Sequence, residues 1–219
     1  MPADFLADIL EQPAALRRAA AAYPTDAIAP LARALRAGRL RNVIVAGMGA
    51  SLYSAYPFCL ALTAAGIPAA DWDASELIHY APAALTAETL LVAISQSGES
   101  VELRRLAELE RRPGAVVSIT NGLESTVARW ADVRVDTAAG PETAGVSSKT
   151  YTTGLAALYL LAGQLQGRPL APALADLARV ADEAEAFLAD GPARAREAAA
   201  FLEPCDALAF IGRGPSMAS

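Results

Sequence analysis

Residues Leu90–Ser100, LLVAISQSGES, decide the fold of this chain. They begin as an uninterrupted apolar run and end in small polar residues around Gly98, and the pattern of residues 101–112 predicts a helix. A buried strand, a polar turn and a helix form the unit of open parallel α/β sheets, which bind ligands at the carboxyl ends of their strands. The turn offers four side chains with hydroxyl or amide groups: Ser95, Gln96, Ser97 and Ser100. We therefore predict a phosphate-binding turn that needs no lysine or arginine.

Further apolar runs alternate with helical patterns on both sides of this stretch, among them a helix predicted over 52–65 and ended by Gly66. Four of the apolar runs predict buried strands: 41–46, 69–72, 115–120 and 133–136. Continuous apolar strands separated by helices predict a doubly wound, five-stranded parallel sheet with helices on both faces, a three-layer α/β fold of the flavodoxin-like kind. Right-handed crossovers place all strand-to-helix turns at one edge. Three polar turns should meet there: 47–51, 95–100 and 142–149.

The chain divides into four segments. Residues 1–40 predict two helices, with a break near Pro13, and residues 41–168 form the α/β domain. Residues 169–205 predict one charged connector helix, over about 171–202. Residues 207–211 predict a strand, and the G-x-G-x-S turn that follows, Gly212–Ser216, repeats the pattern of Gly47–Ser51. Unless this likeness is accidental, residues 206–219 are the truncated start of a second copy of the domain.

Composition excludes several classes of protein. The chain has 219 residues, a net charge of −6 and a pI of about 4.9, with no basic run, so nucleic acid and anionic membranes are poor partners. It has no signal-peptide pattern and no apolar run long enough to span a membrane. Cys59 and Cys205 lack metal-ligand spacing and predict free thiols in a reducing compartment. We expect a cytoplasmic protein without a metal or cofactor.

The turns allow other interpretations. The GMGAS turn could begin a dinucleotide fingerprint, but Leu52 stands where the third glycine should be. A serine nucleophile is disfavoured because the G-x-S-x-G elbow is absent and His79 is the only histidine. Glu142 and Lys149 are either plain loop charges or site residues; Glu142 could orient a hydroxyl or another loop, and Lys149 could pair with an acid.

In combination, four segments resemble the sugar isomerase (SIS) domain family. They are GMGAS at 47–51, ASEL at 74–77, SQSGES at 95–100 and ETAGVSSKTYTT at 142–153. Within the family, the chain is most similar to the isomerase half of the glutamine–fructose-6-phosphate aminotransferases and to double-SIS isomerases and amino-sugar-phosphate deaminases. Those proteins carry two SIS domains in tandem, which agrees with the repeated turn.

The resemblance implies the residues that bind the substrate. The family's phosphate loop corresponds to Ser95–Ser100, and the other contacts come from the first turn and the third: Ser51, Gly145 and Ser147. The family often has threonine where this chain has Ala50, so one hydroxyl contact is lost. A glutaminase segment with a leading cysteine is not matched, which puts glutamine-dependent ammonia supply in doubt.

The resemblance also implies a function. It is binding of fructose-6-phosphate or glucosamine-6-phosphate by part of an aldose–ketose isomerase, a deaminase or an aminotransferase. The alternative is a regulatory module that senses sugar phosphates, although the N-terminal helices lack the basic face of a DNA-binding element. Family members build sites between subunits, so we expect a homodimer. Their catalytic base lies outside the segment matched here; no catalytic residue is assigned, Glu99 included, and residues 1–219 alone should not turn over substrate.

Overall fold

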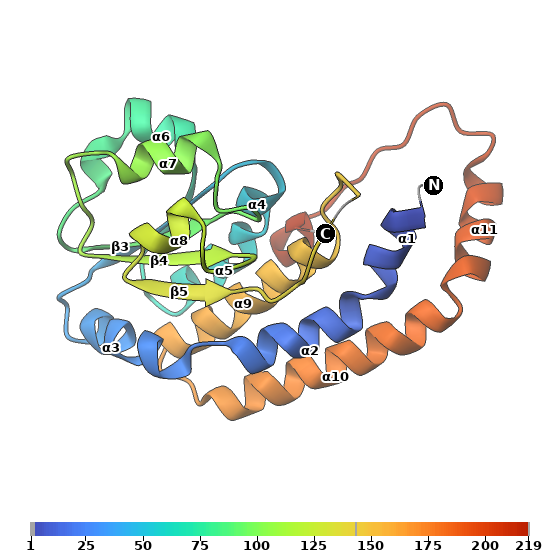
Figure 1. Ribbon diagram of the computed structural model, residues 1–219, viewed down its shortest axis with the longest axis horizontal. Helices are drawn as coiled ribbons and strands as arrows, with labels where there is room; N and C mark the ends of the chain where they lie inside the picture. The colour runs from blue at the N-terminus through green and yellow to red at the C-terminus, as the bar shows by residue number, and fades with distance from the viewer. Residues whose placement is uncertain (1–2, 143, 219) are drawn as a thin grey trace.

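The computed structural model describes residues 3–142 and 144–218. At its centre lies a sheet in which all paired strands run parallel, in the order β2-β1-β3-β4-β5 (Figure 1). The strands are β1 (Asn42–Gly47), β2 (Ala69–Asp73), β3 (Thr89–Ile94), β4 (Ala115–Thr120) and β5 (Val133–Asp136). The strand order reverses between β1 and β3, and open α/β sheets bind ligands beyond the carboxyl ends of the strands at such a reversal. The predicted doubly wound parallel fold is confirmed.

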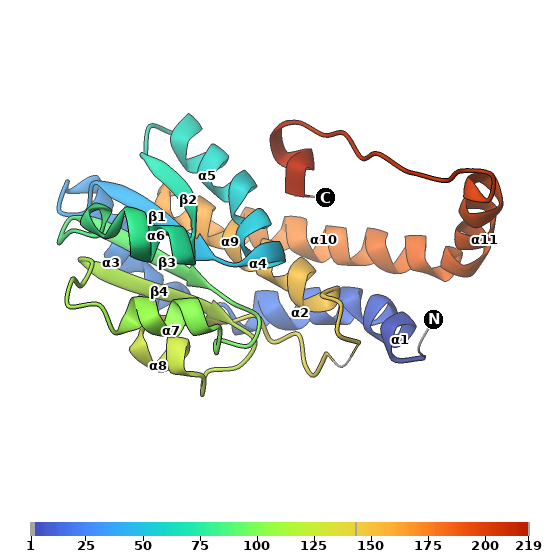
Figure 2. The same ribbon diagram turned by 90° about the horizontal axis from the view of Figure 1, so that it is seen from above.

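Helices cover both faces of the sheet (Figures 1 and 2). One face carries α3 (Thr25–Arg36), α5 (Ala55–Ala64) and α9 (Lys149–Leu165), with α2 (Gln12–Ala22) and α10 (Leu170–Ala189) packed outside α9. The other face carries α6 (Ala74–Tyr80), α7 (Val101–Ala107) and α8 (Thr126–Trp130). Strand β3 supplies both cores, because Leu90 and Val92 face the first layer while Leu91 and Ala93 face the second. Burying one such leucine stabilises the fold by about 1.5–3 kcal/mol.

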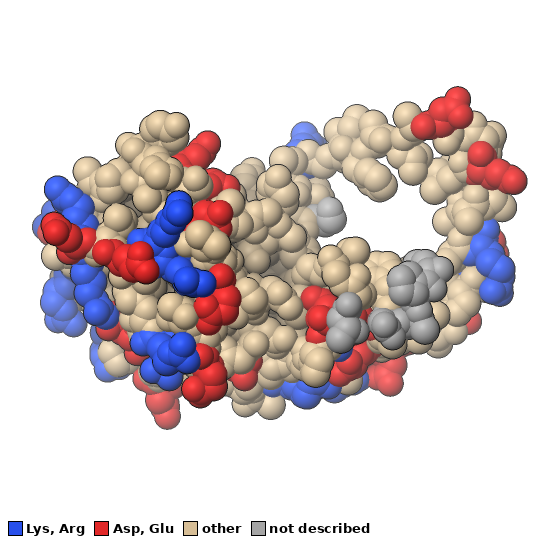
Figure 3. All heavy atoms as spheres, turned by 45° about the horizontal axis from the view of Figure 1, so that its top comes forward, with Lys and Arg blue, Asp and Glu red and all other residues tan. Residues whose placement is uncertain are grey.

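The N-terminal and C-terminal helices extend beyond the sheet. Helix α1 (Ala3–Leu10) joins α2 through Glu11, and Pro13 lies in the first turn of α2, which confirms the predicted break. Helix α10 runs beside α2, whereas α11 (Gly191–Leu202) turns away and the chain returns to end at a short helix, η2 (Gly214–Ala218), against α5 (Figure 2). We call α11 and residues 203–218 the returning arm. The space-filling view shows an opening between this arm and the rest of the molecule (Figure 3). In the described part of the chain, no helix combines the length and the apolarity that crossing a membrane requires.

Three predicted helices differ from those observed, and proline or charge explains each case. The helix predicted over 52–65 is two helices, α4 (Gly49–Tyr53) and α5, because Pro57 cannot donate a hydrogen bond to the preceding turn. The connector predicted as one helix breaks at Asp190, because Pro192 has no N–H with which to continue α10. Helix α7 ends at Ala107 rather than Arg112, since the charged residues that follow offer little apolar surface to bury.

The strand predicted over 207–211 is wrong. These residues have no regular secondary structure, and Phe210 and Ile211 are 94% and 96% exposed. A strand needs a neighbour to which its backbone can hydrogen-bond, and no other described strand pairs with this stretch. That residues 206–219 begin a second domain stays a prediction. A short 3-10 helix, η1 (Pro82–Ala84), completes the described elements.

Candidate functional site

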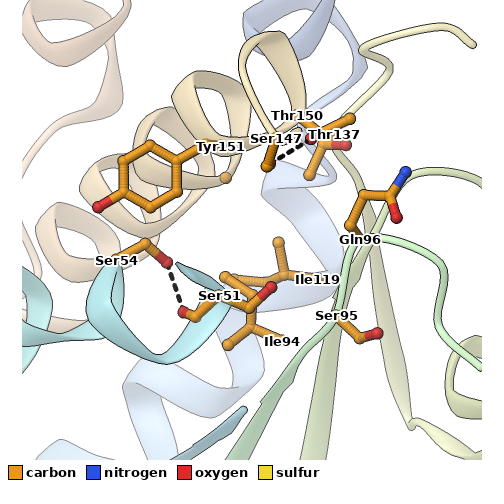
Figure 4. Close-up of a pocket in the computed structure, with 11 residues that line it drawn as sticks. Ser51, Ser54, Ile94, Ser95, Gln96, Ile119, Thr137, Ser147, Thr150 and Tyr151 are labelled. Carbon is orange, nitrogen blue, oxygen red and sulfur yellow. Dashed lines mark hydrogen bonds between the residues drawn. The ribbon is translucent and has the colours of Figure 1, made fainter. Parts of the chain in front are cut away.

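The three polar turns meet at the carboxyl edge of β1 and β3, as the sequence predicts. A narrow cleft of about 20 Å³ lies there, and a second cavity of about 280 Å³ shares three of its lining residues: Ser51, Gln96 and Ser147. Figure 4 shows Ser51 and Ser54 on one side of the cleft and Ser147 and Thr150 on the other. A combined space of this size is near the lower end of the range for small-molecule sites.

The SQSGES loop is ordered by its own hydroxyl groups. The Ser95 side chain is buried and accepts a hydrogen bond from the Gly98 N–H (3.1 Å), and its Oγ lies 2.8 Å from the Ser100 Oγ. Ser97 is exposed, and its Oγ accepts a hydrogen bond from the Glu99 N–H (3.1 Å). Each serine therefore stabilises the turn while keeping further hydrogen-bonding capacity for a ligand.

Gly98 cannot be replaced without changing the loop. Its φ is +64°, in the left-handed region that favours glycine. A Cβ there would also lie 2.0 Å from the Oγ of Ser125, which caps α8 by accepting a hydrogen bond from the Ala128 N–H. The backbone of the loop at Gly98 thus packs directly against the Ser125 side chain at the start of α8.

The structure brings most of the predicted site residues together. Ser51, Ser95, Gln96 and Ser147 line the cleft, and Gly145 lines the larger cavity. Ser97 and Ser100 belong to the same loop but do not line either space. Four polar residues that line the cleft were not predicted from the sequence: Ser54, Thr137, Thr150 and Tyr151. Three of them lie within four residues of a predicted site residue, so the positions next to the first and third turns carried the missing signal.

The residues between β5 and α9, 137–148, form a loop that closes one side of the site; we call it the pocket loop. Glu142 organises its second half. The Glu142 carboxylate accepts hydrogen bonds from the Ser148 N–H (2.8 Å), from the Ser148 hydroxyl (3.0 Å) and from the N–H and hydroxyl of Thr150. Of the two roles considered for Glu142, the structure therefore shows the orienting one. Thr143 lies outside the described residues.

Lys149 does not face the cleft. Its side chain is 2% exposed and forms ion pairs with Asp8 of α1 (3.0 Å) and with Glu11 between α1 and α2 (2.5 Å). Burial alone would lower the pKa of the Lys149 ammonium, but the hydrogen bonds to Glu11 and Asp8 outweigh it and raise that pKa. The hydrogen bond from Lys149 in turn lowers the pKa of the Glu11 carboxyl, against the opposing effect of its partial burial.

The remaining titratable groups of the turns have structural roles. Glu99 accepts a hydrogen bond from the Thr126 N–H (2.6 Å), which lowers the pKa of its carboxyl and ties the SQSGES loop to α8. His79 is exposed in the last turn of α6, on the opposite layer. The described lining residues of both spaces include no Lys or Arg, so the hydrogen-bond donors that line them are neutral, and the charged group among those residues is an acceptor, the Glu142 carboxylate. Within the described residues, no group of three or more His, Cys, Asp or Glu side chains gathers to hold a metal.

The chain is a parallel α/β domain, and a polar pocket lined by hydroxyl and amide groups lies where its strand order reverses. These features define the class of small-molecule-binding domains. Comparison of the sequence with family models identifies the family within this class. The family model described as "SIS domain" matches residues 39–163, more than half of the chain. The chain belongs to the SIS domain family.

Named relatives agree with this assignment. The chain is 33% identical over 220 residues to the isomerizing glutamine–fructose-6-phosphate aminotransferase of Pyrobaculum aerophilum, with 99% of the chain and 36% of that protein covered. It therefore spans about a third of that relative's length. Among solved structures, a candidate phosphosugar isomerase from Silicibacter pomeroyi superposes with a TM-score of 0.80 at 24% identity, over 98% of this chain and 64% of that one. The C-terminal domain of glucosamine-fructose-6-phosphate aminotransferase from Francisella tularensis gives 0.76 at 21% identity, over 98% and 63%. The structural likenesses, at these identities, show the shared fold.

Proposed function

We propose that the chain binds a phosphosugar of the fructose-6-phosphate or glucosamine-6-phosphate type. The protein to which it contributes would be an aldose–ketose isomerase, or a deaminase or aminotransferase of amino-sugar phosphates. The observation that carries the proposal is the meeting of the SQSGES loop, the GMGAS turn and the pocket loop around one cleft. The SQSGES loop would hold the phosphate through neutral donors, and Ser51, Gly145 and Ser147 would contact the sugar. The names of the relatives support the same substrate class.

We further propose that these residues anchor the ligand and do not transfer its protons. Isomerisation requires a base within hydrogen-bond reach of the sugar C2. Glu99 accepts a hydrogen bond from the Thr126 N–H, which lowers the pKa of its carboxyl and makes it a weak base. The Glu142 carboxylate is occupied by hydrogen bonds from Ser148 and Thr150. Catalysis would then depend on groups beyond residues 1–219. We also propose that the chain forms a homodimer and that two copies share the site.

Calorimetric titration tests the proposal. The protein should bind fructose-6-phosphate or glucosamine-6-phosphate and should not bind unphosphorylated fructose at the same concentrations. Ser97→Ala should weaken binding about tenfold or more, because a hydrogen bond to a charged group contributes about 1.5–3 kcal/mol. Ser75→Ala, on α6 in the opposite layer, is the matched control and should bind normally. Equal affinities for the two variants would contradict the assignment of the phosphate loop.

A further inference from the structure

The N-terminal helices hold the pocket loop at both of its ends. At the start of the loop, Arg18 of α2 donates hydrogen bonds from Nε to the Ala138 carbonyl (3.0 Å) and from Nη2 to the Ala139 carbonyl (2.8 Å). At its end, Lys149 pairs with Asp8 and Glu11. Glu11 joins the two ends, because its other carboxylate oxygen accepts a hydrogen bond from Arg18 (2.7 Å).

Two further features show that this arrangement fixes the shape of the loop. Ala138 has a φ of +47°, a conformation that costs a non-glycine residue free energy and persists only where its surroundings impose it. Arg18 on one side and the Asp136 carboxylate, which accepts the Ala138 N–H (2.8 Å), on the other impose it here. At the far end, the Thr152 hydroxyl donates to Gln12 of α2 (2.6 Å), one turn beyond Ser148.

These contacts bear on the site because three of the residues that line the cleft lie within two positions of the groups that α1 and α2 hold. Thr137 precedes the carbonyls that Arg18 holds, and Ser147 and Thr150 flank Lys149. The Ser147 and Thr150 hydroxyls lie 2.7 Å apart, so a shift of the first turn of α9 moves both (Figure 4). Among the described residues, the SQSGES loop has no hydrogen bond to α1 or α2. It is held by Ser125 and Thr126 of the α8 region and by Asn121, whose N–H donates to the Gln96 carbonyl (3.0 Å).

We propose that Asp8, Glu11, Arg18 and Lys149 are positioning residues, through which α1 and α2 set the shape of the sugar side of the site. Loosening this network lowers affinity for the sugar part of a phosphosugar and leaves the phosphate loop intact. The proposal rests on the proposed function, because it assigns the pocket loop to the sugar and the SQSGES loop to the phosphate. It also makes α1 and α2 part of the binding unit, although the family match begins at residue 39.

Two neighbouring arginines provide a matched pair for the test. Arg17 and Arg18 have side chains that are 41% and 42% exposed, and both form short ion pairs, but Arg17 pairs with Asp182 and Glu185 of α10. We expect Arg18→Ala to weaken fructose-6-phosphate binding about tenfold and to leave inorganic phosphate binding within about twofold of the wild type. Arg17→Ala should change neither affinity. Arg18→Lys, which keeps the charge but carries its donors on a single nitrogen, should restore part of the loss.

Hydrogen exchange supplies a second readout. Backbone amides of residues 137–148 should exchange faster in Arg18→Ala than in Arg17→Ala, and those of residues 95–100 should not differ. If the wild type binds phosphosugar and Arg18→Ala binds it equally well, the positioning role is wrong while the proposed function stands. An equal loss of phosphate and phosphosugar affinity also overturns the positioning role. A wild type that binds no phosphosugar overturns the proposed function and this inference with it.

Discussion

At the scale of single residues, the site depends on positions where the backbone has little freedom. Gly98 combines a positive φ with a neighbour, Ser125, that leaves no space for a Cβ. Gly47, at the end of β1, is similarly crowded, since a Cβ there would lie 3.0 Å from Ile94 Cγ2 on β3. Gly47 therefore allows the first turn to lie close to the end of β3, and Gly98 allows the SQSGES loop to lie close to the start of α8.

Gly98→Ala should distort the SQSGES loop and abolish phosphosugar binding. The left-handed conformation alone costs alanine about 1–2 kcal/mol, and the collision with Ser125 adds to that cost. Gly66→Ala is the matched control, because Gly66 has a φ of +80° with nothing within 4 Å of the new Cβ. Urea unfolding and calorimetry should show a similar conformational loss in both variants, with an additional loss of stability and the loss of binding only in Gly98→Ala. Equal behaviour of the two would mean that the close approach to Ser125 is unimportant.

At the scale of the elements, the local sequence pattern predicted the strands and helices whose formation depends on nearby residues. Apolar runs placed strands such as β3 correctly, because a buried parallel strand is apolar on both faces. The same reasoning merged α10 with α11 and assigned a strand to 207–211, since it weighed apolar pattern above Pro192 and above the need for a pairing partner. In the candidate site, the sequence of the turns predicted Ser51 and Gln96, and both line the cleft. No local pattern could reveal that Lys149 pairs with Glu11, 138 residues away.

The packing of α10 on α2 gives an element-scale prediction. Ala181 is 1% exposed in α10 and belongs to the main core, whereas Ala186 of the same helix is exposed. Ala181→Leu should therefore lower the free energy of unfolding by about 1–3 kcal/mol through overpacking. Ala186→Leu should change it by less than about 0.5 kcal/mol. Chemical denaturation measures both, and an unaffected Ala181→Leu would show that α10 is only loosely attached to α2.

At the scale of the whole molecule, the charged network between the N-terminal helices and α9 makes stability depend on pH. The pKa of the Glu11 carboxyl is lowered from 4.5, so its contribution is present above pH 4.5 and is lost as the pH falls through the lower, folded value. The pKa of the Lys149 ammonium is raised from 10.5, so its contribution is complete below pH 10.5 and is lost as the pH rises through the higher, folded value. Glu11 and Lys149 are therefore both charged across the neutral range.

Glu11→Gln tests this dependence. At pH 7 the substitution should destabilise the protein by about 1 kcal/mol, since it replaces charged hydrogen bonds with neutral ones at a partly exposed position. The difference from the wild type should shrink as the pH falls below 4.5, where the wild-type carboxyl itself becomes protonated. Glu197→Gln on the exposed α11 controls for the loss of one negative charge. A gap that stays constant from pH 7 to pH 3 would exclude the ion pairs as its cause.

The returning arm at the C-terminal end has a practical consequence. Residues 207–213 have no regular secondary structure and pair with no described strand, and Figure 2 shows this part of the chain stretched out between α11 and η2. Phe210 is 94% exposed, while the phenylalanine of α5, Phe58, is 3% exposed. A protease binds its substrate as an extended strand, so this stretch already has the shape that cleavage requires. Chymotrypsin should cut the folded chain after Phe210 long before it cuts within the sheet. This cut would separate η2 from α10 and α11.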